Sequence, residues 1–504
     1  MQFGVSESVA HWGKYRPSWP ALYVSDGHLV TYGELNSVVD SVALRVLAAA
    51  PNATRVAVTA RAKSDLLTAL IGVLRAGKSV VVLNPGLPDH AIRTNLSDCE
   101  VSVLIHDAAH ANIAGLIAPT GTALNFQQPL QASFNTQNIL AGIQPRKPND
   151  EWGVLFSSGT TGTPKGIERD HESIVTELLG WCLELGLTRH SSFYIGRPVF
   201  YTGGLVLSLA TLLVSGTVFL PDQTDDNDAT EAWTRYQEVA ASRQLEWAFF
   251  LPDQIRAFCR LAEASREHIR SARCILVMGA PISGDEKVTA ARVLQSIIVE
   301  SWGNSESLGT ITDPEDVETR PNSIGRPFLT DELCIVDEDG SPVPPQQVGR
   351  LAGSQDAGFS RYSSQPGETA RIKRNNLIIS DDIGCMDADG YFYVRGRVQD
   401  WIRGRRSPVF TPEVESKLKT HASVEDCCVV GVPTPDGDFQ LVAAVVVSGG
   451  KSANPALLKS QLNELLGSGR HLDRVVIPET LPRLPSGKID KLAVAERVRA
   501  PDAS

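Results

Sequence analysis

Short apolar runs alternate along the first hundred residues with segments in which apolar side chains recur every three or four positions. The apolar runs lie at 55–60, 79–84 and 101–107, and the segment 64–77 has helical spacing. Strands of this kind separated by amphipathic helices are typical of parallel sheets with crossover helices. We therefore predict a layered α/β fold for a large N-terminal part of the chain.

Local start and stop signals support these helices. Thr31 and Ser64 stand where N-caps are needed, and Gly77 follows the last turn of the helix predicted at 64–77. Further buried strands are expected at 274–280 and 296–303, and each ends in residues able to line a site at the carboxyl end of a strand.

One long apolar region, 205–220, is interrupted by Ser208, Ser215 and Gly216. We interpret it as a buried helix that leads into a strand. A membrane span needs about 18 or more consecutive apolar residues, and the chain has no such run.

The pattern changes near residue 331 to short alternating strands with turn residues between them, which predicts a small β-rich subdomain. After Gly396 we expect a helix at 412–419, a strand pair and a helix at 456–466. These elements suit a separate α+β lid domain, so the predicted domains are 1–398 and 399–504.

Composition removes several classes of function. Of 504 residues, 42% are hydrophobic and 21% charged, which is the balance of a globular protein. The net charge of -11 argues against nucleic acid as a partner. The eight cysteines lack metal-ligand spacing, and adjacent Cys427 and Cys428 cannot form an ordinary disulfide. With no apolar leader, we expect a cytoplasmic, non-membrane protein with reduced thiols.

The segment LFSSGTTGTPKGI, 155–167, has the strongest chemical signal. A strand feeds a loop of small residues whose N–H groups and hydroxyls can surround phosphate oxygens, with a lysine adding charge. The common GxxxxGK[ST] pattern is absent. The candidate phosphate-binding residues are Ser157, Ser158, Gly159, Thr160, Thr161, Gly162 and Lys165.

This loop resembles that of the adenylate-forming superfamily, which contains acyl-CoA synthetases, peptide-synthetase adenylation domains and luciferases. The resemblance extends over nearly the whole chain. It implies an enzyme that uses ATP and Mg²⁺ to convert a carboxylic acid into an acyl-adenylate and pyrophosphate, with the loop handling the β- and γ-phosphates.

Three further blocks match the same family. In SWGNSES, the resemblance implies that Glu306 holds Mg²⁺ beside the nucleotide-binding residues Trp302, Gly303, Asn304 and Ser305. In ISDDIGCMDADGYFYVRGR, it implies that Asp382 binds both ribose hydroxyls and Arg397 contacts ribose or phosphate, while Asp381 and Asp387 are turn and surface acids. In LPRLPSGKID, it places Lys488 against the substrate carboxylate and the α-phosphate. The expected catalytic residues are therefore Lys488, Glu306 and Lys165.

The acid pocket is expected around PVFYTGGL, VMGAP and SWGN. The first segment resembles PLFHTGGL of acyl-CoA synthetases, with Tyr201 in place of histidine. It lacks the aspartate with which amino-acid-activating relatives hold an α-ammonium group, so we expect an acid without an α-amine. The residues expected in this pocket, which suggest an apolar or cyclic acid, are Tyr201, Gly203, Gly204, Gly279, Ala280 and Trp302.

The acceptor is suggested by a departure from the family. CoA ligases read approximately GRxDDxIxxxGxxxxPxEVE where this chain has GRVQDWIRGRRSPVFTPEVE, so Gln399 replaces the hinge acid and Arg406 the glycine of the pantetheine channel. Arg403, Arg405 and Arg406 could bind an amino acid's carboxylate, a pattern similar to coronafacate ligases. They could also be a solvated basic loop.

We therefore expect an amide-forming ligase. CoA and a carrier protein stay open as acceptors, and a non-catalytic nucleotide-binding paralogue is a further alternative. Tyr201 or His171 could serve as general base, although His171 more resembles a residue that packs at a helix start. Oligomeric state is left open.

Overall fold

The computed structural model describes residues 3–24, 27–117, 121–126, 143, 146–157, 164–221, 228–265, 269–306, 308–354, 358–402, 409–447, 453–467, 471–483 and 489–499. They divide into two compact units. The first comprises Met1–Leu333, Ala352–Ile379 and Gly390–Phe392, and the second comprises Cys334–Leu351, Ser380–Asp389 and Tyr393–Ser504. This division places two segments that precede Gln399 in the second unit. The boundary expected near Gln399 stays a prediction about the hinge.

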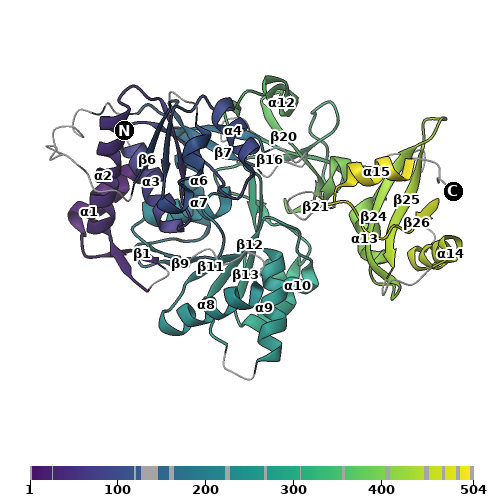
Figure 1. The fold of residues 1–504 in the computed structure, drawn as a ribbon. Coiled ribbons are helices and arrows are strands. Elements are labelled where there is room, and N and C mark those ends of the chain that lie inside the picture. The colour runs from purple at the N-terminus through teal and green to yellow at the C-terminus, as the bar shows by residue number, and fades with distance from the viewer. Residues whose placement is uncertain are drawn as a thin grey trace. The chain divides into compact units, whose positions relative to one another are not determined.

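A nine-stranded sheet forms one half of the first unit (Figure 1). Its central strands are parallel, and antiparallel strands stand at both edges. The order is β15 (Arg326–Pro327), β14 (Gly309–Ile311), β13 (Ile297–Gly303), β12 (Cys274–Met278), β11 (Trp247–Phe250), β9 (Ser192–Ile195), β10 (Thr217–Leu220), β1 (Pro20–Val24) and β2 (Leu29–Thr31).

A seven-stranded sheet forms the other half. Its strands pair in parallel except at β8, which is antiparallel to both of its neighbours, β7 and β18. The order is β18 (Arg361–Tyr362), β8 (Gly166–Asp170), β7 (Glu151–Phe156), β4 (Ser79–Val82), β3 (Arg55–Thr59), β5 (Val103–His106) and β6 (Thr122–Asn125).

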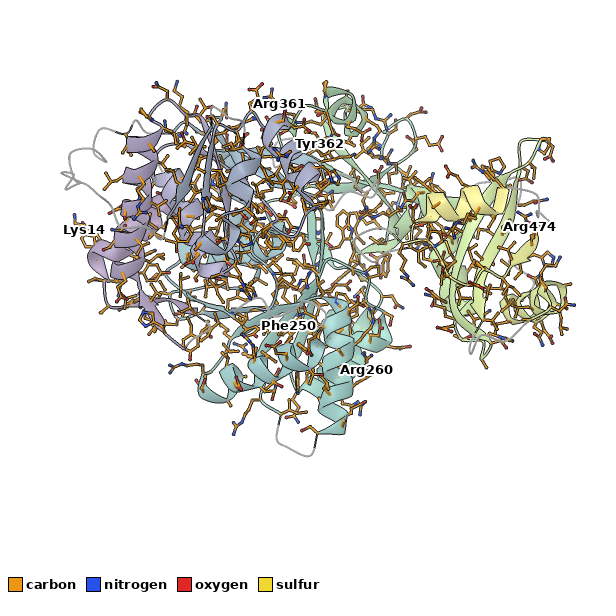
Figure 2. All side chains as sticks on the ribbon, in the orientation of Figure 1. Lys14, Phe250, Arg260, Arg361, Tyr362 and Arg474 are labelled. Carbon is orange, nitrogen blue, oxygen red and sulfur yellow. The ribbon has the colours of Figure 1, made fainter. Side chains whose placement is uncertain are left out.

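Helices cover both sheets. The largest apolar cluster joins helices α2, α3, α6 and α7 to strands of both sheets, and a second packs α8, α9 and α10 on the nine-stranded sheet around the fully buried Phe250 (Figure 2). The helices of this unit are α1 (Val5–Tyr15), α2 (Tyr32–Ala49), α3 (Lys63–Arg75), α4 (Asp89–Asp98), α6 (His171–Glu184), α7 (Thr202–Leu213), α8 (Ala229–Ser242), α9 (Pro252–Ala264), α10 (Gly284–Leu294), α11 (Asp316–Thr319) and α12 (Pro366–Ile372), with 3₁₀ turns at Ala108–His110 and Ile113–Leu116.

Most of the predicted boundaries are confirmed, with one exception. Thr31 caps α2 in a reciprocal box with Glu34, and Gly77 has a φ of +69° beyond the end of α3. Ser64 was the wrong N-cap, because α3 begins one residue earlier at Lys63. The buried Lys63 ammonium donates to the Ile195 carbonyl at 3.0 Å, a tertiary contact that the local pattern does not contain.

The second unit contains most of a five-stranded sheet, a two-stranded sheet and a three-stranded sheet with helices. The first of these has the order β16 (Leu333–Val336), β17 (Gly349–Ser354), β20 (Leu377–Met386), β19 (Lys373–Arg374), with β21 (Phe392–Arg397) paired to β20. The other elements are a 3₁₀ turn η3 (Val398–Asp400), β22 (Trp401–Ile402), β23 (Val409–Phe410), α13 (Thr411–Leu418), β24 (Val424–Pro433), β25 (Phe439–Val447), α14 (Pro455–Leu466), β26 (Arg474–Val476) and α15 (Lys491–Arg499).

The predicted α/β class, the β-rich segment after residue 331 and the α+β C-terminal part are therefore confirmed. Region 205–220 is helix α7 followed by strand β10, as expected. All eight cysteines are free thiols. Within the described ranges, no helix is long and apolar enough to cross a membrane.

Candidate functional site

The β7–β8 hairpin holds the two ends of the predicted phosphate loop. Phe156 pairs with Gly166, and the Ser157 N–H donates to the Lys165 carbonyl at 3.1 Å. Both residues are thereby fixed where the strands end, which is where a loop that wraps phosphate must be anchored. The remaining predicted loop residues, Ser158, Gly159, Thr160, Thr161 and Gly162, lie outside the described residues.

Lys165 points its ammonium at a segment from a distant part of the chain. Its Nζ lies 2.5 Å from Glu368 Oε2 and 5.2 Å from the centre of the Tyr362 ring. The hydrogen bond from Lys165 lowers the pKa of the Glu368 carboxyl. The Glu368 side chain is 37% exposed, and a pair so close to solvent contributes little stability. A phosphate oxygen could therefore replace this carboxylate at small cost.

The predicted magnesium ligand stands on a turn that follows strand β13. Gly303 pairs with Gly309 across the strand end, and the Asn304 N–H donates to the Leu308 carbonyl at 3.1 Å. The carboxylate of Glu306 accepts a hydrogen bond from the Tyr362 hydroxyl. Trp302 packs against an apolar cluster that includes Ile167, Leu308, Phe359 and Tyr362.

Tyr362 thus contacts both predicted charged groups, since its hydroxyl binds Glu306 and its ring lies beneath Lys165. The described part of the chain holds no cluster of three or more His, Cys, Asp or Glu residues able to bind a metal by themselves. A single carboxylate at a phosphate site fits Mg²⁺, which is usually held by one or two carboxylates, phosphates and water. Glu306 would be its protein ligand here.

The three segments expected to form the acid pocket follow or end the strands β9, β12 and β13. The Thr202 hydroxyl donates to Ser305 Oγ at 3.1 Å. A Cβ at Gly203 would lie 2.4 Å from Met278 Cε, so the two segments are in close contact. A Cβ at Gly204 would lie 2.6 Å from the Pro198 carbonyl oxygen, a backbone approach that only glycine allows. Gly279 turns the chain after β12 with a φ of +94°, and the exposed Ala280 follows.

Tyr201 stands at the start of α7, where its side chain is partly accessible. The residue is 37% exposed, its ring centroid lies 4.7 Å from that of Phe200, and the Arg197 guanidinium lies 5.9 Å from its ring. The aromatic surface and neighbouring cation could contact an aromatic or polar acid.

In the second unit, the two residues expected to contact the ribose are neighbours. Arg397 Nε lies 3.3 Å from Asp382 Oδ1, and the Asp382 side chain is 12% exposed. Asp387 accepts from the Tyr393 hydroxyl at 3.1 Å and from the Asp389 N–H at 3.0 Å, which is the turn role expected of it. Asp381, also expected to be a turn or surface acid, pairs with Arg350 at 2.9 Å.

The predicted hinge residue Gln399 lies in the η3 turn. Next to it, Asp400 binds the Lys491 ammonium at 2.6 Å, and Lys491 also contacts Glu415 at 3.1 Å. The arginines Arg403, Arg405 and Arg406 lie outside the described residues, between the paired Ile402 and Val409 of β22 and β23. Lys488 also lies outside them, between the bridged residues Arg483 and Ile489.

His171 lies at the wrong end of a strand for catalysis. It begins α6 directly after β8, whereas Lys165 precedes β8, and five extended residues span about 17 Å. Burial lowers the His171 pKa to about 4, and the backbone N–H of His171 donates to the Asp150 carbonyl at 3.1 Å. The packing interpretation is therefore favoured over the general-base one.

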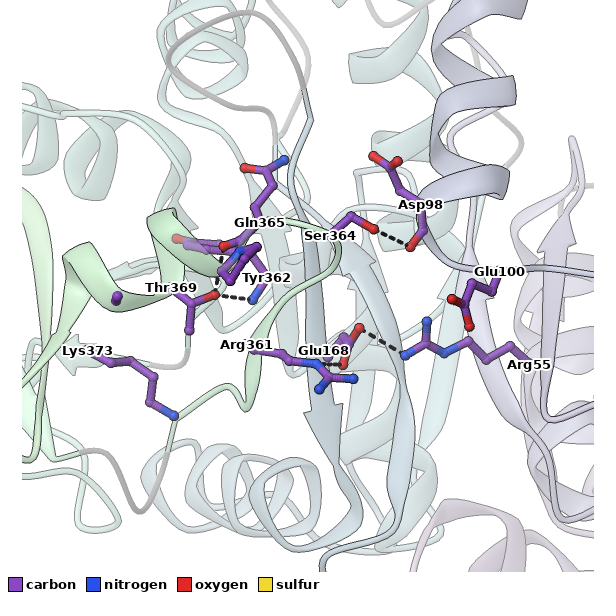
Figure 3. Close-up of a pocket in the computed structure, with 12 residues that line it drawn as sticks. Arg55, Asp98, Glu100, Glu168, Arg361, Tyr362, Ser364, Gln365, Thr369 and Lys373 are labelled. Carbon is purple, nitrogen blue, oxygen red and sulfur yellow. Dashed lines mark hydrogen bonds and ion pairs between the residues drawn. The ribbon is translucent and has the colours of Figure 1, made fainter.

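A pocket of about 460 Å³ is lined by Tyr362 and other residues of its segment, together with Arg55 and Glu168 (Figure 3). Glu168 lies between two guanidinium groups there, 2.9 Å from Arg55 and 2.7 Å from Arg361, and the Lys373 ammonium donates to the carbonyls of Phe359 and Ser360. The Arg361–Glu168 pair ties the segment 359–373 to β8, and the Lys373 contacts join its two ends, so we interpret these charges as its anchor.

Three site residues were missed in the sequence: Tyr362, Glu368 and Thr202. Tyr362 is 56 positions from Glu306 and Glu368 is 203 from Lys165, so no local spacing connects them. The only signal available was an aromatic residue and a carboxylate in a polar stretch, SRYSSQPGETA, between predicted strands. Thr202 was part of the quoted PVFYTGGL segment, but its contact with Ser305 is purely tertiary.

Two family models and several curated proteins match this chain. The family model described as AMP-binding enzyme matches residues 9–363, and that described as AMP-binding enzyme C-terminal domain matches 413–488. A feruloyl-CoA synthase from Amycolatopsis sp. is 28% identical over 94% of each chain, and a 3-hydroxybenzoate–CoA ligase from Aromatoleum sp. (strain CIB) is 25% identical over 95% of this chain and 94% of that one.

Solved structures share the fold. ATP-bound MatB from Rhodopseudomonas palustris superposes with a TM-score of 0.81 at 22% identity, covering 99% of both chains. The amide bond synthetase McbA from Marinactinospora thermotolerans gives a TM-score of 0.80 at 22% identity, covering 98% of this chain and 99% of that one.

Proposed function

Because this chain belongs to the family of AMP-binding enzymes, and is thereby an AMP-forming, ATP-dependent ligase, we propose that it joins a carboxylic acid without an α-amine to an amine acceptor. The product would be an amide, with release of pyrophosphate and AMP. The acceptor proposed is an amino acid.

One observation supports the first half-reaction at residue level. Lys165 at the end of the β7–β8 hairpin and Glu306 after β13 both contact Tyr362, which brings a cation and a carboxylate together. A lysine ammonium beside a single carboxylate suits a magnesium-bound triphosphate, because Mg²⁺ is usually held by one or two carboxylates, phosphates and water. When bound, Mg²⁺ would offset part of the triphosphate charge.

In this proposal, a carboxylate oxygen of the acid attacks the α-phosphorus, and the bond from that phosphorus to the bridging oxygen breaks. Pyrophosphate leaves with the bonding electron pair, and Lys165 stabilises its charge. Lys488 would orient the attacking carboxylate and stabilise charge at the α-phosphate. Asp382 and Arg397, which lie 3.3 Å apart, would bind the ribose.

The acid is proposed to be aromatic or cyclic. The site segments present the partly exposed Tyr201 together with Gly203 and Met278, which lie close together. Two relatives are named for aromatic acids, feruloyl-CoA synthase and 3-hydroxybenzoate–CoA ligase.

The second half-reaction would use the basic connection between β22 and β23. The acceptor's amine attacks the acyl carbon, AMP leaves with the electron pair of the broken C–O bond, and the ammonium loses a proton. Arg403, Arg405 and Arg406 in this connection would bind the acceptor's carboxylate, because guanidinium groups match carboxylates in paired hydrogen bonds. Arg406 stands where CoA ligases carry a channel glycine, which argues against CoA.

A second candidate is an acid–CoA ligase, favoured by the CoA-dependent names of relatives that cover 94% or more of the chain. A product assay separates the two. The protein is incubated with ATP, Mg²⁺ and a panel of aromatic acids, together with either single amino acids or CoA, and the products are identified by mass. We expect amides. A CoA thioester without any amide would overturn the proposed acceptor.

Acid-dependent exchange of labelled pyrophosphate into ATP tests the first half-reaction separately. Lys165→Ala should abolish most of this exchange. Lys147→Ala serves as the matched control, because Lys147 precedes β7 and lies at the opposite end of that strand from the loop. No exchange by the wild-type protein with any acid would overturn adenylation itself.

A further inference from the structure

Tyr362 occupies a position that the proposed roles of Lys165 and Glu306 do not explain by themselves. Its hydroxyl donates to Glu306 Oε1, and its ring centre lies 5.2 Å from the Lys165 ammonium. The residue is only 4% exposed, so both contacts are made in a water-poor environment where hydrogen bonds to charged groups are strong.

The surroundings of Tyr362 hold it in a single place. Its ring packs against Phe359 with centroids 4.7 Å apart, and its N–H donates to Thr369 Oγ1 at 3.0 Å. In strand β18 it pairs with Ile167 of β8, two residues after Lys165. The neighbouring Arg361 is fixed to the buried Glu168, which Arg55 of β3 also holds (Figure 3).

This anchoring has a consequence for Glu306. The glutamate stands on a turn after β13, in the nine-stranded sheet, whereas Tyr362 belongs to the seven-stranded sheet. Their hydrogen bond therefore ties the turn that carries the predicted metal ligand to the hairpin that carries the phosphate-binding lysine. One carboxylate oxygen is engaged by Tyr362, and the other is the one that could face a cation.

We propose that Tyr362 is a positioning residue for adenylation, which holds the carboxylate of Glu306 in the orientation required for magnesium and supports the Lys165 ammonium beside it. This inference rests on the proposed function, because it assumes that Glu306 and Lys165 receive a magnesium nucleotide. Tyr362 itself takes no part in bond making or breaking.

The test measures ATP binding by calorimetry over a series of free Mg²⁺ concentrations and in EDTA. Tyr362→Phe keeps the ring but removes the hydroxyl. The free Mg²⁺ concentration needed for half-maximal tightening of ATP binding should rise about tenfold, the effect of losing one hydrogen bond to a charged group. ATP affinity in EDTA should stay within about twofold of wild type, because the ring still supports Lys165.

Two further variants sharpen the result. In a Glu306→Gln background, adding Tyr362→Phe should change the Mg²⁺ requirement no further, because the hydroxyl acts through that carboxylate. Tyr362→His can still donate from a ring nitrogen and should lie between wild type and Tyr362→Phe; it also replaces the Phe variant if that variant does not fold.

Tyr32→Phe is the matched control, since it removes another buried hydroxyl, which donates to the Gly216 carbonyl at 2.8 Å. It should lower the melting temperature and leave the Mg²⁺ requirement unchanged. The inference is overturned if Tyr362→Phe shows the wild-type Mg²⁺ requirement, or loses ATP affinity equally with Mg²⁺ and in EDTA. If the wild-type protein neither binds MgATP nor exchanges pyrophosphate, the proposed function has failed instead.

Discussion

At the scale of single residues, the least expected group is Asp331. Its carboxylate accepts the Gly309 N–H at 2.9 Å, beside the turn that carries Glu306, yet burial raises its pKa to about 7, with nearby Glu177 adding to the effect. Because the folded pKa lies above the ordinary value of 3.8, the folded state prefers the protonated acid.

The stability of the first unit should therefore depend on Asp331 ionisation. The raised pKa stabilises the folded state at low pH by at most ~4 kcal/mol. This stabilisation is fully present below about pH 4 and is lost as the pH rises through 7. We predict that Asp331→Asn removes this part of the pH dependence, measured as melting temperature between pH 4 and 8. Asp253→Asn, at a side chain that is 86% exposed, should retain the wild-type profile. Parallel profiles for wild type and Asp331→Asn would contradict the assignment.

Glu368 offers a second test at this scale, because its carboxylate pairs with the Lys165 ammonium, which we propose binds phosphate. Glu368→Gln should strengthen ATP binding by about two- to fivefold, the worth of a solvent-exposed ion pair. Calorimetry with ATP measures this, and Glu263→Gln, which removes an exposed pair with Arg292, is the matched control. Weaker binding by Glu368→Gln would mean that the carboxylate orients the lysine and does not compete with phosphate.

At the scale of elements, the strand that ends at the Glu306 turn is held by a buried ion pair. Lys287 of α10 contacts Glu300 of β13 at 2.7 Å, and the two side chains are 1% and 8% exposed. The Lys287 ammonium also donates to the Ser323 carbonyl at 3.0 Å. Removing one partner leaves a buried charge without compensation, which is far more costly than removing both.

We therefore predict that Lys287→Met lowers the unfolding free energy by about 3–5 kcal/mol, and that the double variant Lys287→Met, Glu300→Gln recovers most of this loss. Urea denaturation followed by tryptophan fluorescence provides the measurement. A double variant as unstable as the single one would show that the two side chains contribute through packing and not through their charges.

The sequence predicted helices and strands better than it predicted contacts between side chains. The helix at 64–77 and the strands near 274–280 and 296–303 were visible, because burial on one face of a helix or on both faces of a parallel strand produces a local pattern. The start of α3 was misplaced by one residue, and the contact of its first residue, Lys63, joins positions 132 apart, which no local pattern shows. The role of Tyr362 was not predicted either, because its hydrogen bond to Glu306 joins residues 56 positions apart.

At the scale of the whole molecule, the residues predicted to act in adenylation belong to two compact units. Lys165, Glu306 and Tyr362 belong to the first, whereas Asp382, Arg397 and the segment around Lys488 belong to the second. The motifs predicted a role for each residue, but the sequence alone does not give the distances between their side chains. The hydrogen bonds around Tyr362 and the Asp382–Arg397 contact had to come from the structure.

Lys488 tests whether the second unit supplies a group for only one half-reaction. Its positive charge is proposed to act on charge that develops at the α-phosphate during adenylation, so Lys488→Ala should slow pyrophosphate exchange by about 100-fold or more. ATP binding should change little, because the phosphate contacts assigned to Lys165 remain. Lys459→Ala, which removes a lysine bonded to the Asp473 carbonyl in the same unit, should leave exchange unchanged.

Supplying the acyl-adenylate directly separates the two steps. With synthetic adenylate and an amino acid, Lys488→Ala should form the amide at nearly the wild-type rate, because the α-phosphate bond has already been made. Arg406→Gly should show the reverse, with exchange intact and amide formation reduced, since the proposed acceptor contact is lost. If both variants were impaired equally in both assays, Lys488 and Arg406 would each be needed for both steps. The assignment of separate residues to separate steps would then be wrong.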